Sequence, residues 1–476
     1  MYAQAVTIPA APSEPSGLPE PQTRGYFFNL VRSISPTSLE LELRRVAEAG
    51  FNLVVFPVYS NGWTLFQSAT AREYGLPSIN PRLSKWDAVE QVIRLADRFG
   101  LTVWGFARPY NFHPRYSIAE HRLLRKHPDW RLRAHPQHLT ARTRRAESLH
   151  PCPLNPDYRR FVGSLLAELA AGYNIPGIVI NYTAVGIEGG PIKSSPFCFC
   201  ASCRERFRET HGVELAAEAL HGDLELVRAW QRDQMHLHLR YLRHRLLKMR
   251  HSLRLVARVR PQWREGAFDS QLLTPGVSLL DWSTLAREGA LETLVIDHDN
   301  ERLGPLFSTR LAADYAYLGD QVLFLPMLSV HDLDDLSIPM AVLRRYPCTG
   351  FIGEFQRSFT DGDTQFLARQ VFGNPAILPS DRPLQTAAYF LNLVHQTHQD
   401  QPELRELTRD ILRLISRQSP HPHDFELLRV MEQNLRGLEQ AIRRGALGFG
   451  SIPERTLIHL GLARRFVRIA LMDVPT

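Results

Sequence analysis

The sequence lacks the features that mark several large classes of protein. Its 476 residues contain no apolar run long enough to cross a bilayer, no internal repeat and no nucleic-acid-binding motif. Residues 1–24 have neither the basic n-region nor the sustained apolar h-region of a signal peptide. Their proline, serine and glycine content is typical of a disordered leader. We therefore expect a soluble, cytoplasmic protein without a membrane span.

Acidic residues are fewer than basic residues, which gives a formal net charge of +7 at neutral pH. The basic residues gather near residues 131–145 and 240–254, and such clusters can meet phosphates. In the second cluster, however, they alternate with leucine at helical spacing, which favours a solvated helix face. The interpretation as a phosphate- or nucleic-acid-binding protein thus rests on the net charge alone, and we expect no nucleic-acid partner.

From residue 25 onward, short apolar runs alternate with amphipathic helical patterns. The runs are rich in Val, Ile, Leu and Phe, as in parallel strands that are buried on both faces. Eight runs predict an α/β fold, a (β/α)8 barrel with long loops after strands three and four. A doubly wound open sheet is the alternative, but no G-x-G-x-x-G follows the first strand, which disfavours a dinucleotide-binding version. The expected strands are 25–31, 51–59, 101–110, 175–181, 253–261, 291–299, 321–328 and 348–355.

The last hundred residues differ, because they contain helical patterns without strand patterns. We expect a helical C-terminal region that packs on the barrel and is a candidate interface for a homo-oligomer. The predicted organisation is thus a leader at 1–24, a barrel at 25–375 and a helical region at 376–476.

Functional side chains of a (β/α)8 barrel lie where the strands end and the following loops begin. At these positions the sequence has aromatic rings, arginines, asparagines and carboxylates, which suit a sugar, because rings stack on its apolar face and forked donors bind its hydroxyls. The alternative is that several of them only cap strand ends or pair with each other. The expected substrate-binding residues are Asn61, Trp63, Arg108, Tyr110, Asn181, Tyr182 and Asp299.

Several segments resemble glycosyl-hydrolase-like (β/α)8 barrels of the family-10 and family-6 types. The strongest are "HPDW" and the series "CPLNPDYRRF", "ELAAGYNIPGIVINY" and "CFCASCRERFRETHG". "FNLVVFPVYSNGWTLFQS" is similar to their second strand and loop, and "DWSTLAREGALETLVI" to their fifth helix and sixth strand. The resemblance covers about residues 25–375 and implies a barrel that acts on carbohydrate, with no organic cofactor.

Three of the five cysteines, Cys198, Cys200 and Cys203, lie within six residues, and Cys152 lies 46 residues upstream. The two segments flank neighbouring parts of the predicted barrel, so four thiolates could converge on one tetrahedral zinc. The arrangement also resembles the zinc cluster of family-42 β-galactosidases. With four sulfur ligands the zinc would be structural and would hold a long loop. The alternatives are buried free thiols or a disulfide, and the fifth cysteine, Cys348, is expected in the core.

A glycosidase needs two carboxylates about 5 to 9.5 Å apart. The related barrels commonly end the fourth strand in aspartate, where this sequence has Asn181, and the β-galactosidases end it in Asn-Glu, where it has Asn181-Tyr182. An amide cannot serve as general acid or strong nucleophile. We therefore expect Glu354 and Asp297 to be the catalytic pair, with Glu188 as a reserve acid. The alternative is a catalytically inactive carbohydrate-binding barrel.

Overall fold

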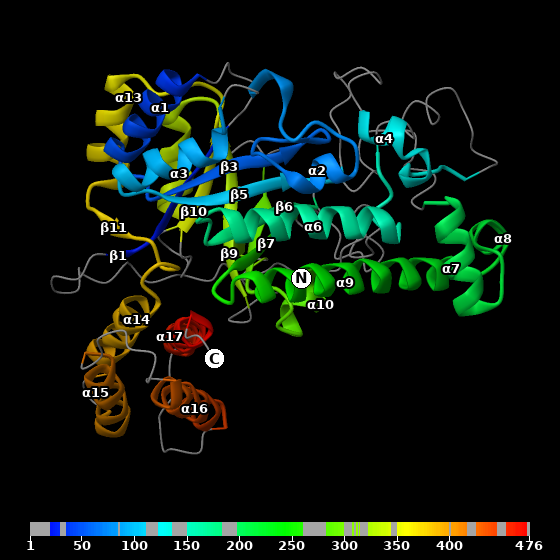
Figure 1. Cartoon of the computed structure of the whole chain (residues 1–476). Helices are drawn as coiled ribbons and strands as arrows, with labels where there is room; N and C mark the ends of the chain where they lie inside the picture. The colour runs from blue at the N-terminus through cyan, green and yellow to red at the C-terminus, as the bar shows by residue number, and fades with distance from the viewer. Residues whose placement is uncertain are drawn as a thin grey trace. The chain divides into compact units, whose positions relative to one another are not determined.

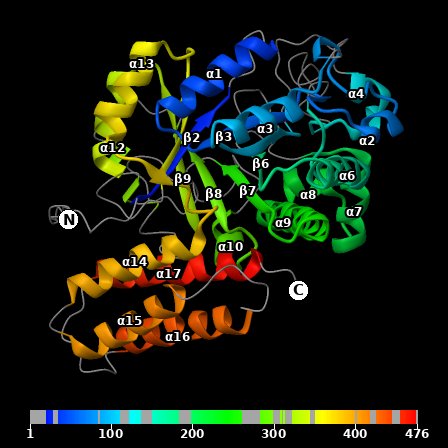
Figure 2. The ribbon, with the colours of Figure 1, turned by 60° about the vertical axis from the view of Figure 1, so that its left-hand side comes forward.

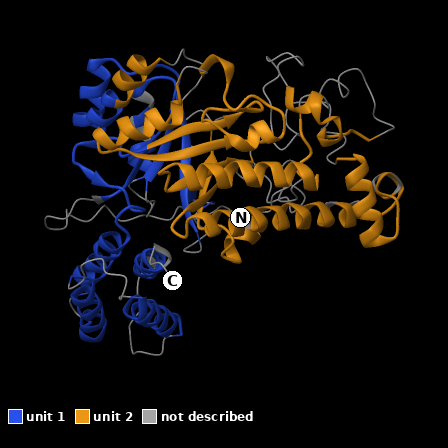
Figure 3. Cartoon of the chain, viewed as in Figure 1, with its two compact units in different colours: residues 1–26, 44–53, 299–476 blue, residues 27–43, 54–298 orange. Residues whose placement is uncertain are grey.

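The structure is a computed structural model. It describes residues 20–28, 35–83, 86–110, 122–135, 150–182, 198–259, 282–298, 307–308, 311–312, 314, 322–343, 350–398, 401–416, 425–444 and 454–473. The chain forms two compact units, shown in Figure 3. Unit 1 comprises residues 1–26, 44–53 and 299–476, and unit 2 comprises residues 27–43 and 54–298.

Eight parallel strands form a closed β-barrel surrounded by helices, which confirms the predicted (β/α)8 fold and excludes the open sheet. The strand order is β2, β10, β9, β8, β7, β6, β5, β3, and β2 also pairs with β3. Of these strands, Figure 1 labels β3, β5, β6, β7, β9 and β10. Each strand overlaps one of the eight predicted runs. The strands are β2 (Thr23–Phe27), β3 (Leu53–Ser60), β5 (Thr102–Arg108), β6 (Gly177–Asn181), β7 (Arg254–Val259), β8 (Thr293–Asp297), β9 (Leu323–Val330) and β10 (Gly350–Phe355).

The strands of unit 2 are buried on both faces, which explains their nearly continuous apolar sequence. Helix α6 (Pro156–Gly172) precedes β6 and packs against α9 (Leu224–Met249). It begins sharply because Asn155 Oδ1 accepts hydrogen bonds from the N–H groups of Asp157 and Tyr158, both at 3.0 Å. Pro156 at the first helical position needs no such partner.

Glu168 of α6 binds the start of the short helix α2 (Ala69–Glu73). Its carboxylate accepts from the Ser68 hydroxyl at 2.7 Å and from the N–H groups of Ala69 and Thr70 at 2.5 and 3.1 Å. Burial opposes its ionisation, but these hydrogen bonds outweigh burial and lower the pKa of Glu168. The loop after β3 is thereby tied to α6.

In unit 1, aromatic rings pack around Phe51. Its ring centroid lies 5.9 Å from Tyr26, 5.6 Å from Phe355, 5.8 Å from Phe359 and 5.2 Å from Phe372. Most of these pairs are edge-to-face, the geometry that the ring quadrupoles favour. This cluster lies beside β2 and β10 and fixes the segment that follows β10.

The helical C-terminal region is present, as predicted. Helix α14 (Pro383–Thr397) packs against α15 (Pro402–Ser416) and α17 (Glu454–Asp473), and α16 (Phe425–Arg443) packs against α17 (Figure 2). Buried leucines and phenylalanines of these helices form a common core. Among the described helices, none has the length and hydrophobicity that a bilayer-spanning segment needs.

Short strands and further helices complete the described chain. Strand β4 (Trp63–Thr64) pairs antiparallel with the end of β3, and β1 (Glu20–Pro21) pairs in parallel with β11 (Ala376–Ile377). The other helices are α1 (Pro36–Glu48), η1 (Pro81–Leu83), α3 (Ala88–Arg98), α4 (Arg122–Lys126), η2 (Pro128–Trp130), α7 (Ala201–His211), α8 (Leu215–His221), α10 (Trp282–Arg287), η5 (Leu333–Leu336), α12 (Ser337–Leu343), α13 (Asp361–Phe366) and the π-helix η6 (Leu367–Phe372).

Candidate functional site

The four cysteines of the predicted metal motif come together in unit 2. Their sulfur atoms all lie within 4.8 Å of one another, and all four residues are buried. The Cys152 Sγ is 3.5 Å from the Cys203 Sγ and 3.9 Å from the Cys200 Sγ. All four are free cysteines, so no disulfide joins them. The structure thus confirms that Cys152 meets the C-x-C-x-x-C segment, and the disulfide alternative is wrong.

Backbone hydrogen bonds explain how these two distant segments meet. The Cys152 N–H donates to the Trp130 carbonyl at 2.7 Å, and the Phe199 N–H donates to the Arg133 carbonyl at 2.9 Å. The Arg133 N–H also donates to the Cys198 Sγ at 3.4 Å. The short segment after "HPDW" therefore binds both cysteine-bearing segments, and this explains why that motif accompanies the cysteines.

The cluster fits a tetrahedral metal ion. At a Zn–S distance of about 2.3 Å, the sulfurs of a regular tetrahedron lie about 3.8 Å apart, and the two measured distances fall on either side of this value. Burial raises the pKa of the Cys152 thiol, whereas hydrogen bonds from Cys152, Cys198 and Cys203 lower the pKa of Cys200. Opposite shifts arise because neighbouring buried thiols resist a second negative charge. A bound cation removes this resistance and favours thiolate at all four positions.

Strand β8 ends in Asp297, which forms a buried ion pair with Arg258 of β7. The Arg258 Nη2 and Nε atoms lie 2.7 and 3.2 Å from the Asp297 Oδ2, and the two side chains are 6% and 7% exposed. The guanidinium lies over the rings of Phe27 and Phe106, at 5.3 and 5.8 Å from their centroids. Only the structure pairs this arginine with the expected catalytic aspartate.

Asn181 ends β6 next to this ion pair. It is buried, and it is in register with Arg258 of β7. Arg108 ends the neighbouring strand β5 and is partly exposed. The carboxyl ends of β5 to β8 thus carry a row of polar side chains, as the barrel predicts. Asn61 and Trp63 are both partly exposed and lie at the turn between β3 and β4, where Asn61 has a φ of +54°.

Tyr110 and Tyr182 are both expected to bind substrate, but the structure places both rings in the interior. They stack on each other with centroids 5.5 Å apart, and Tyr110 also meets Tyr158 of α6. The Tyr110 hydroxyl forms a hydrogen bond with the Nε2 of His238 from α9. Burial lowers the pKa of His238 well below its ordinary value, so this imidazole is neutral. Tyr110 therefore packs against α6 and α9, and Tyr182 stacks on Tyr110.

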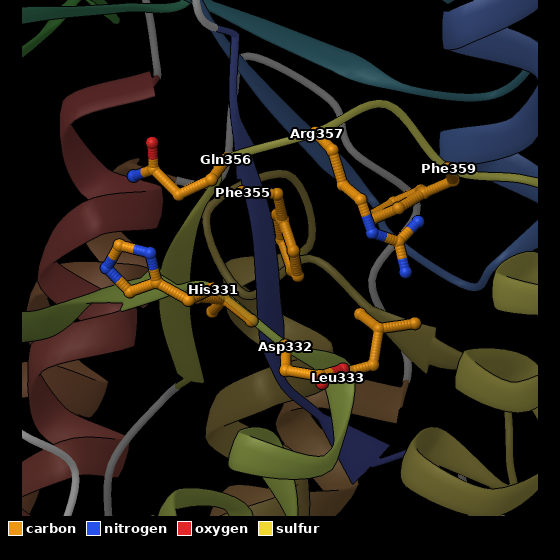
Figure 4. A pocket seen from close by; sticks show the side chains of 8 residues that line it. His331, Asp332, Leu333, Phe355, Gln356, Arg357 and Phe359 are labelled. Carbon is orange, nitrogen blue, oxygen red and sulfur yellow. The ribbon is translucent and has the colours of Figure 1, made fainter.

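Glu354 lies one residue before the end of β10, in register with Ser329 of β9, and is partly exposed. Its chain neighbour Phe355 lines a small open pocket (Figure 4), and Glu354 is not among the lining residues. In Figure 4 the His331 ring and the Arg357 guanidinium lie on opposite sides of the Phe355 ring. The pocket is lined by Val330, His331, Asp332, Leu333, Phe355, Gln356, Arg357 and Phe359.

Arg357 is held at the edge of this pocket by Asp363 of α13. Its Nη2 lies 2.9 Å from the Asp363 Oδ1, and a second contact joins its Nη1 to Oδ2. The hydrogen bond and charge of Arg357 lower the pKa of Asp363 despite its partial burial. The remaining predicted residues, Glu188, Asp299 and Cys348, lie outside the described residues.

The fold is a (β/α)8 barrel with polar side chains at the carboxyl ends of its strands, where enzymes of this fold hold their functional groups. The chain belongs to the glycosyl hydrolase-like 10 family, whose model matches residues 35–304, more than half of the chain. This family confirms the resemblance that the sequence motifs indicate. No curated protein matches the chain by sequence.

Solved structures with the same fold include two glycosidase domains. The catalytic domain of β-amylase from Paenibacillus polymyxa is 13% identical with a TM-score of 0.53, over 75% of this chain and 99% of that one. The PgaB (BpsB) glycoside hydrolase domain from Bordetella bronchiseptica is 12% identical with a TM-score of 0.50, over 75% and 97%. Alpha-L-fucosidase isoenzyme 2 from Paenibacillus thiaminolyticus is 13% identical with a TM-score of 0.45, over 74% of this chain. The chain spans only about half of that fucosidase, 49% of its length.

Proposed function

We propose that this protein hydrolyses an O-glycosidic bond of an oligo- or polysaccharide, with Glu354 and Asp297 as its two carboxylates. The observation that carries the proposal is the polar row Asn181, Arg258 and Asp297 at the carboxyl ends of adjacent strands, in a barrel of a glycosyl hydrolase-like family. In (β/α)8 enzymes this rim of the barrel holds the reacting groups.

The two carboxylates differ in surroundings, which supports different roles. Asp297 is paired with the Arg258 guanidinium at the end of β8, and we assign it the role of nucleophile or base. Glu354 lies within the apolar strand β10 and is partly exposed, and we assign it the role of the general acid. Asn61, Trp63, Arg108 and Asn181 are the proposed contacts to the sugar.

We also propose that Cys152, Cys198, Cys200 and Cys203 hold one structural zinc ion. When bound, zinc would crosslink the two cysteine-bearing segments and stabilise the fold. Four thiolates fill a tetrahedral zinc, so the chain leaves no position for water or substrate. The metal would therefore hold the segments in place and take no part in hydrolysis.

One observation favours a second function, a carbohydrate-binding barrel without catalysis. Asn181 is an amide at the strand end where related barrels carry a carboxylate, and Asp297 is buried in an ion pair that limits its approach to a substrate. In this case the same rim binds a sugar and does not cut it.

A glycan screen with three proteins separates these functions. We expect the natural protein to cleave at least one oligosaccharide, and Glu354→Gln to lose about 10² to 10⁴ in rate while it still binds the sugar. Asp361→Asn is a matched control, because it also changes a carboxylate to an amide but lies 82% exposed at the start of α13. It should cleave normally.

Three results test the two proposed functions, hydrolysis and sugar binding without catalysis. Binding without turnover in the natural protein contradicts hydrolysis and supports the binding barrel, and a gain of cleavage in Asn181→Asp would strengthen that conclusion. If Glu354→Gln cleaves a glycan as fast as the natural protein, a group other than Glu354 is the general acid. If the natural protein neither binds nor cleaves any glycan, that result contradicts both functions.

A further inference from the structure

Within the part of the chain that the structure describes, two arginines near the cysteine cluster form no ion pair with a carboxylate. Arg159 of α6 donates from Nε to the Pro153 carbonyl at 2.9 Å, and Arg206 of α7 donates from Nη1 to the Leu154 carbonyl at 3.0 Å. Both carbonyls belong to the residues directly after Cys152. The two guanidiniums therefore bind the backbone of the segment that carries one of the four sulfurs.

The same two side chains also meet at a single residue of α9. Arg159 Nη2 donates to the Gln234 carbonyl at 2.5 Å, and Arg206 Nη2 donates to the Gln234 Oε1. All these acceptors are neutral, and within the described part of the chain neither arginine forms an ion pair with a carboxylate. Two positive charges thus lie close together and partly buried.

Such an arrangement is unfavourable by itself. Burial and the charge of Arg206 lower the pKa of Arg159 to about 10, which still leaves it protonated at neutral pH. A negative charge on Cys152 or Cys203 would act in the opposite direction. Two like charges in a partly buried place need a compensating anion, and the cysteine cluster is the anion-forming group beside them.

The charge of a metal-bound cluster matches this requirement. Four thiolates and one divalent cation carry a net charge of −2, and two guanidiniums carry +2. We infer that Arg159 and Arg206 are charge-compensating residues for a divalent metal tetrathiolate, and that they strengthen its affinity for the metal. This inference rests on the proposed metal centre and adds to it the groups that balance its charge, which act through the sulfurs rather than on the metal.

The same contacts connect the metal to the barrel. Arg159 belongs to α6, the helix that precedes β6, and Gln234 belongs to α9, the helix that precedes β7. The compensating pair therefore ties the cluster to the two helices that pack together behind the strands carrying Asn181 and Arg258. A bound metal would therefore support these helices through the arginines.

The test measures metal affinity in the full-length protein, with zinc in a chelator competition and with Co²⁺, whose thiolate complex absorbs visible light. Arg206→Met removes the positive charge and keeps much of the length of the side chain. Arg206→Lys keeps the charge and loses the forked guanidinium group. Arg208→Met is the matched control, since Arg208 lies on the same helix, 60% exposed, with Glu214 at 3.4 Å as its own partner. Circular dichroism of each metal-free variant checks the fold.

We expect Arg206→Met to bind zinc about 10- to 100-fold more weakly than the natural protein. Arg206→Lys should recover most of that loss, and Arg208→Met should bind normally. If Arg206→Met does not fold, Arg159→Lys and Arg206→Lys remain testable, and both should retain zinc within a few-fold.

Different results would contradict charge compensation and the metal site itself. Unchanged affinity in Arg206→Met, or equal losses in Arg206→Met and Arg206→Lys, overturns charge compensation while the metal site stands. A fold-retaining Arg159→Lys that loses zinc overturns it as well. If the natural protein binds neither zinc nor Co²⁺, both this inference and the proposed metal centre fail.

Discussion

The ion pair of Arg258 and Asp297 can be tested separately for stability and for activity. Asp297→Asn removes the carboxylate that accepts both Arg258 hydrogen bonds, at 2.7 and 3.2 Å. Because the two side chains are only 6% and 7% exposed, water cannot replace the lost charge easily. Removing one partner of a buried pair costs about 3–5 kcal/mol, and we expect a loss of that size in the free energy of unfolding.

A second change distinguishes the ion pair from simple misfolding. Arg258→Met combined with Asp297→Asn removes both charges, and the methionine can pack between the rings of Phe27 and Phe106. Replacing a buried ion pair by an apolar group is often neutral or stabilising. The double variant should therefore be clearly more stable than Asp297→Asn alone.

Urea unfolding, followed by far-ultraviolet circular dichroism, measures these differences. Glu214→Gln is the control for an exposed pair, because Arg208 and Glu214 are 60% and 53% exposed, and it should cost at most about 1 kcal/mol. An Asp297→Asn loss below about 1 kcal/mol, or a double variant no more stable than the single one, would refute the reasoning. If the double variant folds but cleaves no glycan that the natural protein cleaves, the role of Asp297 in catalysis is supported.

Three further predictions follow from other parts of the structure. Cys200→Ser should reduce the zinc content measured by mass spectrometry from about one per chain to near zero and lower the melting temperature, whereas unchanged zinc content would contradict the four-sulfur site. Since hydrogen bonds lower the folded pKa of Glu168, its contribution to stability is fully present above the unfolded pKa of about 4.3 and is lost as pH falls through the folded pKa. Glu168→Gln should reduce the fall in melting temperature below pH 5. An unchanged fall would show that the hydrogen bonds from Ser68 and the α2 backbone to this carboxylate do not contribute to stability. Phe51→Ala should cost about 3–5 kcal/mol in urea unfolding, because its 4% exposed ring packs on four others, and a loss below 1 kcal/mol would contradict that packing.

Much of the fold follows from local patterns in the sequence. The eight barrel strands coincide with eight apolar runs, because a strand buried on both faces needs apolar residues throughout its length. The helical C-terminal region likewise follows from apolar residues at helical spacing. The cysteine spacing was specific enough to predict that Cys152 joins Cys198, Cys200 and Cys203.

The roles of single polar residues needed the tertiary structure. Tyr110 and Tyr182 follow strands just as sugar-binding rings would, yet both are buried. Tyr110 contacts Tyr158 and His238, and Tyr182 stacks on Tyr110. In a strand buried on both faces, the sequence does not tell which side chains point into the barrel and which point toward the helices. The ends of strands therefore identify candidate residues without identifying the direction of each side chain.

Pairs of charges are even less visible in the sequence. Arg258 meets Asp297 because of the stagger between β7 and β8, and Arg159 lies near Arg206 because α6 and α7 carry cysteine-bearing segments to one place. The sequence by itself determined most of the helices and strands and the cysteines of the proposed metal site, since both depend on short-range periodicity and spacing. Only the tertiary structure decided which charges neutralise each other, because electrostatic energy depends on distance and burial in space rather than on separation along the chain.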